Sequence, residues 1–174
     1  MKTKQLIIII AVILLPCWAM SQSASKAIFE KYADKEGFTS VIISGDLFQM
    51  LVSDDGDVNV NGNKINTKGF RISDIKGIRL LSISNEDGEN QKMLESLVNE
   101  TEAAFAKDKP RYTELVQIQS GKEKINVLGR KEKSKIHELI VYRRNAGEKE
   151  VTLIYIEGPF DEEMVNKMIR ETIK

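Results

Sequence analysis

The sequence predicts an α+β fold, with helices packed on a mostly antiparallel sheet in a single two-layer domain. Three observations support this fold class. The first half of the chain alternates short β-branched runs with amphipathic helical stretches. From Tyr112 onward the apolar residues recur at every second position, which is the period of consecutive strands. A last helical pattern then follows the sequence PFDEE at residues 159–163.

The N-terminal half begins with an amphipathic helix over residues 25–35, in which Ile28, Phe29 and Tyr32 share one face. Gly37 follows this helix, at a position where helices often end with a glycine in the left-handed conformation. The sequence FTSVIIS at 38–44 is apolar on both faces, which favours a strand in the middle of the sheet. A short helix is predicted directly after it, at GDLFQMLV.

Residues 54–74 form a polar segment that we interpret as an insertion or a hairpin. The dipeptide Asn61-Gly62 favours a two-residue type I′ hairpin turn, which requires positive φ at both positions. This register pairs Val60 with Asn63, and it pairs Val58 with Ile65.

The second half begins with a strand over residues 75–84 and a long helix over residues 89–107. Four strands follow, joined by short turn sequences: 112–119, 123–131, 135–144 and 150–158. The last of them is apolar on both faces, which predicts a central position. The C-terminal helix has an apolar stripe made of Met164, Val165, Met168 and Ile169. We expect the first and last helices to cover the same face of the sheet.

The N-terminus has the pattern of a secretory signal peptide over residues 1–21, followed by one domain over residues 22–174. Lys2 and Lys4 precede an apolar run that is too short for a membrane span, which needs about 20 residues. We therefore expect an exported protein, periplasmic or extracellular, without a transmembrane segment in the mature chain. The alternative is a lipoprotein attached through Cys17, although Pro16 argues against that site.

Composition excludes several classes of function. Cys17 is the only cysteine, so a chain cleaved after Ser21 would have no disulfide, no thiolate metal site and no cysteine nucleophile. The chain has 26 basic and 26 acidic residues, and loss of Lys2 and Lys4 leaves an excess of two acids. This balance gives no electrostatic footprint for nucleic acid, so we expect no nucleic-acid partner.

The spacing of the sequence DVNVNG resembles the opening half of a calcium-binding loop. The candidate metal ligands are Asp55, Asp57, Asn59 and Asn61. The twelfth position of such a loop, normally a bidentate glutamate, is Lys68. We therefore favour the hairpin over the calcium loop. A weaker ion site at Asp54, Asp55 and Asp57 stays open.

No group of residues in the sequence indicates catalysis or cofactor binding. His137 is the only histidine and has no evident metal or nucleophile companion. The sequence contains no GxSxG nucleophile motif and no glycine-rich phosphate loop. Glu162 and Glu163 are explained by their place at a helix start. We predict no catalytic residues and no cofactor.

The stretches FEKYADKEGFTSVIIS and IKGIRLLS, together with the N-terminal pattern, resemble a family of small exported proteins of Bacteroidetes, domain of unknown function family 4252 (DUF4252). The resemblance implies a cell-envelope address and an α+β domain. It supplies no catalytic residues. Where that family often has an acidic helical segment, this chain has DVNVNGNKINTKGF.

We expect a non-enzymatic envelope module that binds a protein or a small-molecule ligand, because the chain has a core but no reactive group of residues. Its structural sign would be an exposed apolar patch on the sheet. One alternative is a calcium-binding module that uses residues 54–61. The other is a carboxylate-based hydrolase, which would need two acids with raised pKa values in one cleft.

Overall fold

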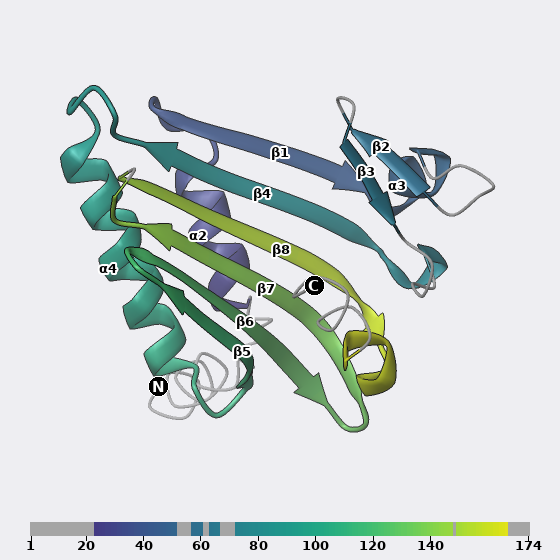
Figure 1. Cartoon of the computed structure of the whole chain (residues 1–174). Coiled ribbons are helices and arrows are strands. Elements are labelled where there is room, and N and C mark those ends of the chain that lie inside the picture. The colour runs from purple at the N-terminus through teal and green to yellow at the C-terminus, as the bar shows by residue number, and fades with distance from the viewer. Residues whose placement is uncertain (1–22, 52–56, 61–62, 67–71, 148, 167–174) are drawn as a thin grey trace, which may run out of the picture.

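The computed structural model describes residues 23–51, 57–60, 63–66, 72–147 and 149–166. Its main feature is a six-stranded sheet with the strand order β1-β4-β8-β7-β6-β5 (Figure 1). Every neighbouring pair in this sheet is antiparallel. The predicted α+β class is confirmed.

The elements lie within a few residues of their predicted positions. The strands of the large sheet are β1 (Phe38–Ser44), β4 (Gly77–Ser84), β5 (Tyr112–Ser120), β6 (Glu123–Glu132), β7 (Lys135–Asn145) and β8 (Glu150–Phe160). The helices are α2 (Ala24–Tyr32), α3 (Gly45–Leu51), α4 (Gln91–Lys107) and the short 3₁₀ helix η1 (Ile72–Asp74). Residues 162–166 are also helical.

Strand order confirms one prediction about the sheet and contradicts another. The last strand, β8, lies between β4 and β7 and is central, as its two apolar faces predicted. The prediction that residues 38–44 lie mid-sheet is wrong, because β1 is an edge strand. The apolar residues on both faces of β1 are not all buried: Val41 is 41% exposed and Ile42 is 65% exposed.

One face of the sheet is covered by α2 and α4, and we call it the helix-covered face. Val151, Leu153 and Tyr155 alternate along β8 and point to this face, where they are almost completely buried. Ile28, Phe29 and Tyr32 of α2 pack in the same cluster, as their predicted helical stripe requires. The main hydrophobic core therefore lies between the sheet and these two helices.

The helical residues 162–166 pack on the other face of the sheet. Met164 and Val165 are buried beside Leu139 and Phe160, with Ile156 packed against them. Because successive residues of a strand point to opposite faces, Ile156 lies opposite the face of Tyr155. The expectation that the first and last helices share one face is therefore wrong. Met168 and Ile169 lie outside the described residues.

The polar segment contains a separate two-stranded sheet made of β2 (Asp57–Val60) and β3 (Asn63–Asn66). The predicted pairing of Val58 with Ile65 and of Val60 with Asn63 is confirmed. The turn residues Asn61 and Gly62 lie outside the described residues. In Figure 1 this hairpin lies beside α3, at the end of β1.

The start of α4 is fixed by Asn85, which is almost fully buried. The Asn85 side chain accepts a hydrogen bond from the backbone N–H of Asn90 and donates one to Gln91, both at 2.7 Å. Gly37 has a φ of +83°, as predicted, and a Cβ there would lie 2.5 Å from the Asn90 Oδ1. The turn before β1 and the start of α4 thus meet closely.

Candidate functional site

An unbroken row of aliphatic side chains crosses the sheet on the face opposite α2 and α4. The backbone register aligns one residue from each strand, in the order Val41, Leu80, Ile154, Val141, Val127 and Val116. We call these six residues the apolar row, and the face that carries them the open face. The row runs from one edge of the sheet to the other.

The side chains of the apolar row are only partly buried. Val41 is 41% exposed, and the five others have intermediate exposure. In Figure 1, α2 lies behind the sheet, and the helical residues 162–166 lie at one end of the strands on the near side. An antiparallel sheet with one solvent-exposed face usually has polar residues on that face. This face instead has an aliphatic residue from each of the six strands along the apolar row.

Charged pairs border the apolar row at both ends of the strands. Arg143 follows Val141 by two positions and so lies on the same face, where it forms ion pairs with Glu123 at 2.6 Å and with Glu150 at 3.0 Å. At the other end, Lys135 contacts Asp161 at 2.6 Å. An apolar centre with a polar rim is the usual anatomy of a protein interface.

A buried polar cluster lies on the helix-covered face. Glu138 is 3% exposed and accepts a hydrogen bond from the Tyr112 hydroxyl at 2.9 Å. Its other oxygen, Oε1, accepts from Arg130 Nε at 2.6 Å. Burial, together with the negative charge of Glu138, raises the pKa of Tyr112 above its usual value. Both carboxylate oxygens have protein donors, so this cluster ties β5, β6 and β7 together.

Sequence reasoning missed both the apolar row and the Glu138 cluster. The sequence predicts the strands and the two apolar faces of residues 150–158, but alignment across strands depends on the sheet order. The only sequence signal for the cluster is an acidic residue inside the apolar strand KIHELIVY. Arg130 and Tyr112 lie on other strands, at distances along the chain that no motif fixes.

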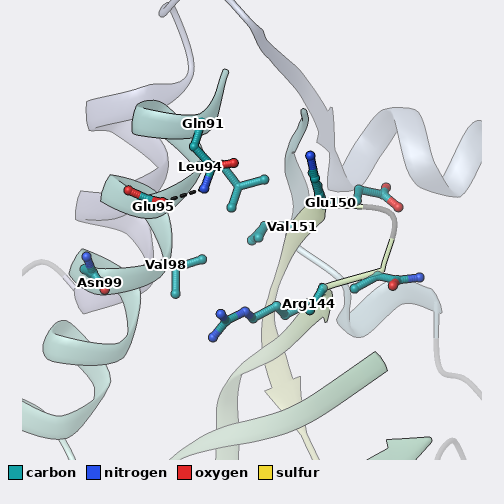
Figure 2. Close-up of a pocket in the computed structure, with 11 residues that line it drawn as sticks. Gln91, Leu94, Glu95, Val98, Asn99, Arg144, Glu150 and Val151 are labelled. Atoms are coloured by element: carbon teal, nitrogen blue, oxygen red, sulfur yellow. Dashed lines mark hydrogen bonds between the residues drawn. The ribbon is translucent and has the colours of Figure 1, made fainter. Parts of the chain in front are cut away.

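A small hollow lies between α4 and the ends of β7 and β8 (Figure 2). It has a volume of about 210 Å³ and is lined by Leu94 and Val98 among others. Two acids line it, but Glu95 is hydrogen-bonded to Gln91 and Glu150 is paired with Arg143. Sites for small molecules usually have volumes of about 300–1,000 Å³, so this hollow suits at most a very small ligand.

Two further hollows, of about 260 and 230 Å³, are also small. The second of these is lined by Tyr142, whose hydroxyl has no hydrogen-bond partner among the described residues. Burial raises the pKa of Tyr142 to about 12. Glu114, on the wall of the same hollow, accepts a hydrogen bond from Asn126 at 3.0 Å.

The predicted metal ligands are only partly described. Asp57 and Asn59 lie on β2, whereas Asp55 and Asn61 lie outside the described residues, as does Asp54. The calcium site therefore stays a prediction. Within the described ranges, no group of three or more His, Cys, Asp and Glu side chains is arranged to hold a metal ion.

The other residues singled out from the sequence are separate from one another. His137 is partly buried on β7, beside the irregularity between Ile136 and Glu138. Glu162 and Glu163 are exposed at the start of the helical residues 162–166. Cys17 lies outside the described residues. The pKa of Glu100 is lowered, chiefly by the hydrogen bond from Lys31, which is the direction opposite to that of a general acid.

None of the described helices combines the length and the apolar character needed to cross a membrane.

Comparison with known proteins identifies a family. No curated protein and no solved structure matches the chain. The profile of the family described as domain of unknown function (DUF4252) matches residues 32–168, which is most of the 174-residue sequence and spans every strand of the sheet. The chain therefore belongs to the DUF4252 family.

Proposed function

We propose that the protein is an exported, non-enzymatic module that binds a protein partner through the apolar row on the open face. One observation carries the proposal: all six strands contribute an aliphatic side chain to a face that the described helices cover only at one end. Burying such side chains is favourable by about 25 cal/mol for each Å² removed from water.

The shape of the surface favours a protein over a small molecule. Neighbouring strands lie about 4.8 Å apart, so a row across six strands extends over about 24 Å. A row of that length suits the flat contact of a protein interface, whose fully buried core is richer in apolar atoms than its rim. The three hollows described above are smaller than ordinary ligand sites.

The N-terminal pattern supports an address in the cell envelope. Lys2, Lys4 and the apolar run that follows them have the layout of a secretory leader. On this proposal the partner is a protein of the periplasm or of the outer surface, and it meets the sheet after export.

Photo-crosslinking in intact cells tests the proposal. A photoreactive amino acid replaces Val127, the residue of β6 in the apolar row, and in a control strain it replaces Ser96, which is exposed on α4. We expect one reproducible adduct with a second protein from position 127 and none from position 96. Absence of an adduct at position 127, or the same adducts from both positions, would contradict the proposal. An adduct with the mass of two copies would instead assign the open face to self-association.

A further inference from the structure

Strand β1 forms an edge of the sheet, and its own sequence lacks the residues that usually protect an edge. Its sequence, FTSVIIS, has no charged residue and no proline, and it is the only strand of the six without a charge. It pairs with β4 over all seven residues without a bulge. Natural edge strands normally have charges, prolines or bulges that prevent another strand from pairing with them.

The opposite edge of the sheet is protected. Strand β5 contains Glu114, and its pairing with β6 is interrupted by a register shift between Glu114 and Val116. Bulges twist an edge and block further pairing. The two edges of the described sheet therefore differ, because β5 has a charge and a bulge and β1 has neither.

The geometry of the β1–β4 ladder identifies which backbone groups face outward. The Gly45 N–H donates to the Lys76 carbonyl at 2.9 Å, one position beyond the pair of Ser44 with Gly77. Hydrogen-bonded and non-hydrogen-bonded pairs alternate along an antiparallel ladder. The odd-numbered residues of β1 therefore bond to β4, and the backbone N–H and C=O groups of Ser40 and Ile42 point away from it.

Several of the exposed side chains at this edge are large and apolar. Ile42 is 65% exposed and Val41 is 41% exposed. Leu47 and Met50 of α3, which follows β1 directly, are 45% and 82% exposed. These four are the large hydrophobic residues that are most exposed in the described part of the chain. Strand β1 lies along one edge of the sheet, and α3 lies at the end of β1 (Figure 1).

We propose that β1 pairs antiparallel with β1 of a second copy of this chain, so that the two sheets join into one of twelve strands. An antiparallel pair of identical strands is self-complementary about a two-fold axis, so it closes as a dimer and does not extend into a filament. No charges oppose each other in this pair, because β1 has none. The inference is independent of the partner bound at the open face.

Matching of side chains selects the register of this pair. With Ile42 on the two-fold axis, Ile42 lies opposite Ile42 of the second copy, and Val41 lies opposite Ile43 of the second copy. This register also places Ser40 opposite Ser44 of the second copy. It joins the outward-facing backbone groups of Ile42 in a hydrogen-bonded pair, and in such pairs the Cα atoms lie about 5.5 Å apart.

Light scattering on the purified exported protein at micromolar concentration measures the mass in solution. We expect a dimer, and we expect Ile42→Lys and Ser40→Lys to be monomers, because Ile42→Lys places two like charges on the axis and Ser40→Lys adds a charge to the edge that pairs. The control Gln117→Lys changes an exposed residue of the opposite edge strand, β5, and should remain a dimer. The far-ultraviolet circular dichroism spectrum should be the same for all four proteins.

A disulfide tests the register. In a chain with Cys17→Ser, which removes the only cysteine, Ile42→Cys should form a disulfide-linked dimer on mild oxidation, because the expected Cα spacing allows it. Thr39→Cys should not. A monomeric native protein, a dimer that survives Ile42→Lys, or a filament would overturn the proposal. A dimer without the disulfide at position 42 would overturn the register.

Discussion

Substitution of Arg130 should lower the free energy of unfolding by an amount that follows from its contacts in the buried cluster. The Glu138 side chain is 4% exposed, and Arg130 Nε and a second guanidinium nitrogen each lie 2.6 Å from its Oε1. Methionine replaces the apolar methylene part of the Arg130 side chain but not its guanidinium group. Arg130→Met therefore leaves the buried Glu138 carboxylate with the Tyr112 hydroxyl as its remaining donor among these contacts. Breaking a buried ion pair from one side costs about 3–5 kcal/mol. Glu132 also loses Arg130, but it is exposed, so that loss is small.

The double variant Arg130→Met/Glu138→Met separates the ion pair from other effects of the substitution. It removes both charges, and its main cost is the Tyr112 hydroxyl left without an acceptor, about 1–3 kcal/mol. The double variant should therefore be more stable than Arg130→Met. Urea denaturation, followed by circular dichroism, measures the free energy of unfolding of each protein. The reasoning is refuted if Arg130→Met costs less than about 1 kcal/mol, or if the double variant is the less stable of the two.

Three further predictions concern the core and the tyrosines. Burial raises the pKa of Tyr142 and Tyr155 to about 12 from the ordinary 10.0, so the folded state holds these protons more tightly. Their contribution to stability should be complete below pH 10 and lost as the pH rises toward 12, and phenolate absorbance of the folded protein should show no midpoint near 10. Gly158→Ala would place a Cβ 2.1 Å from the Asp74 carbonyl oxygen and should cost about 1–3 kcal/mol by urea denaturation, whereas Gly77→Ala, with 3.6 Å to its nearest neighbour, should cost little. Leu97→Ala, at a fully buried position of α4, should cost about 2–5 kcal/mol, and an equal cost for Val41→Ala would contradict the assignment of the core.

Most elements of the fold could be predicted because their periodicity is local. The stripe Ile28, Phe29 and Tyr32 fixes α2, and the Asn61-Gly62 turn signal fixes the pairing of β2 with β3. The edge position of β1 could not be predicted, because apolar residues on both faces of a strand can be buried by the protein or by something that binds to it. FTSVIIS has the pattern of a central strand but lies at an edge.

The candidate surface is less predictable than the fold. Val116, Val127, Val141 and Ile154 each belong to a predicted strand, but they form a row only because β8 returns to lie between β4 and β7. That return is a contact between distant parts of the chain, and no turn signal encodes it. The Glu138 cluster depends instead on the register of the consecutive strands β5, β6 and β7, which is shifted by bulges that no turn signal encodes.

The affinity of the crosslinked partner for purified variants tests the central claim most directly. Val127→Lys places a charge within the apolar row, and Ser96→Lys places the same charge on the exposed surface of α4. Both variants should melt close to the native protein, because neither position is fully buried. If the open face is the binding surface, Val127→Lys should weaken binding by about 2 kcal/mol or more, roughly 30-fold, and Ser96→Lys should leave it unchanged. Equal affinities for the native protein and Val127→Lys would contradict the assignment of the open face.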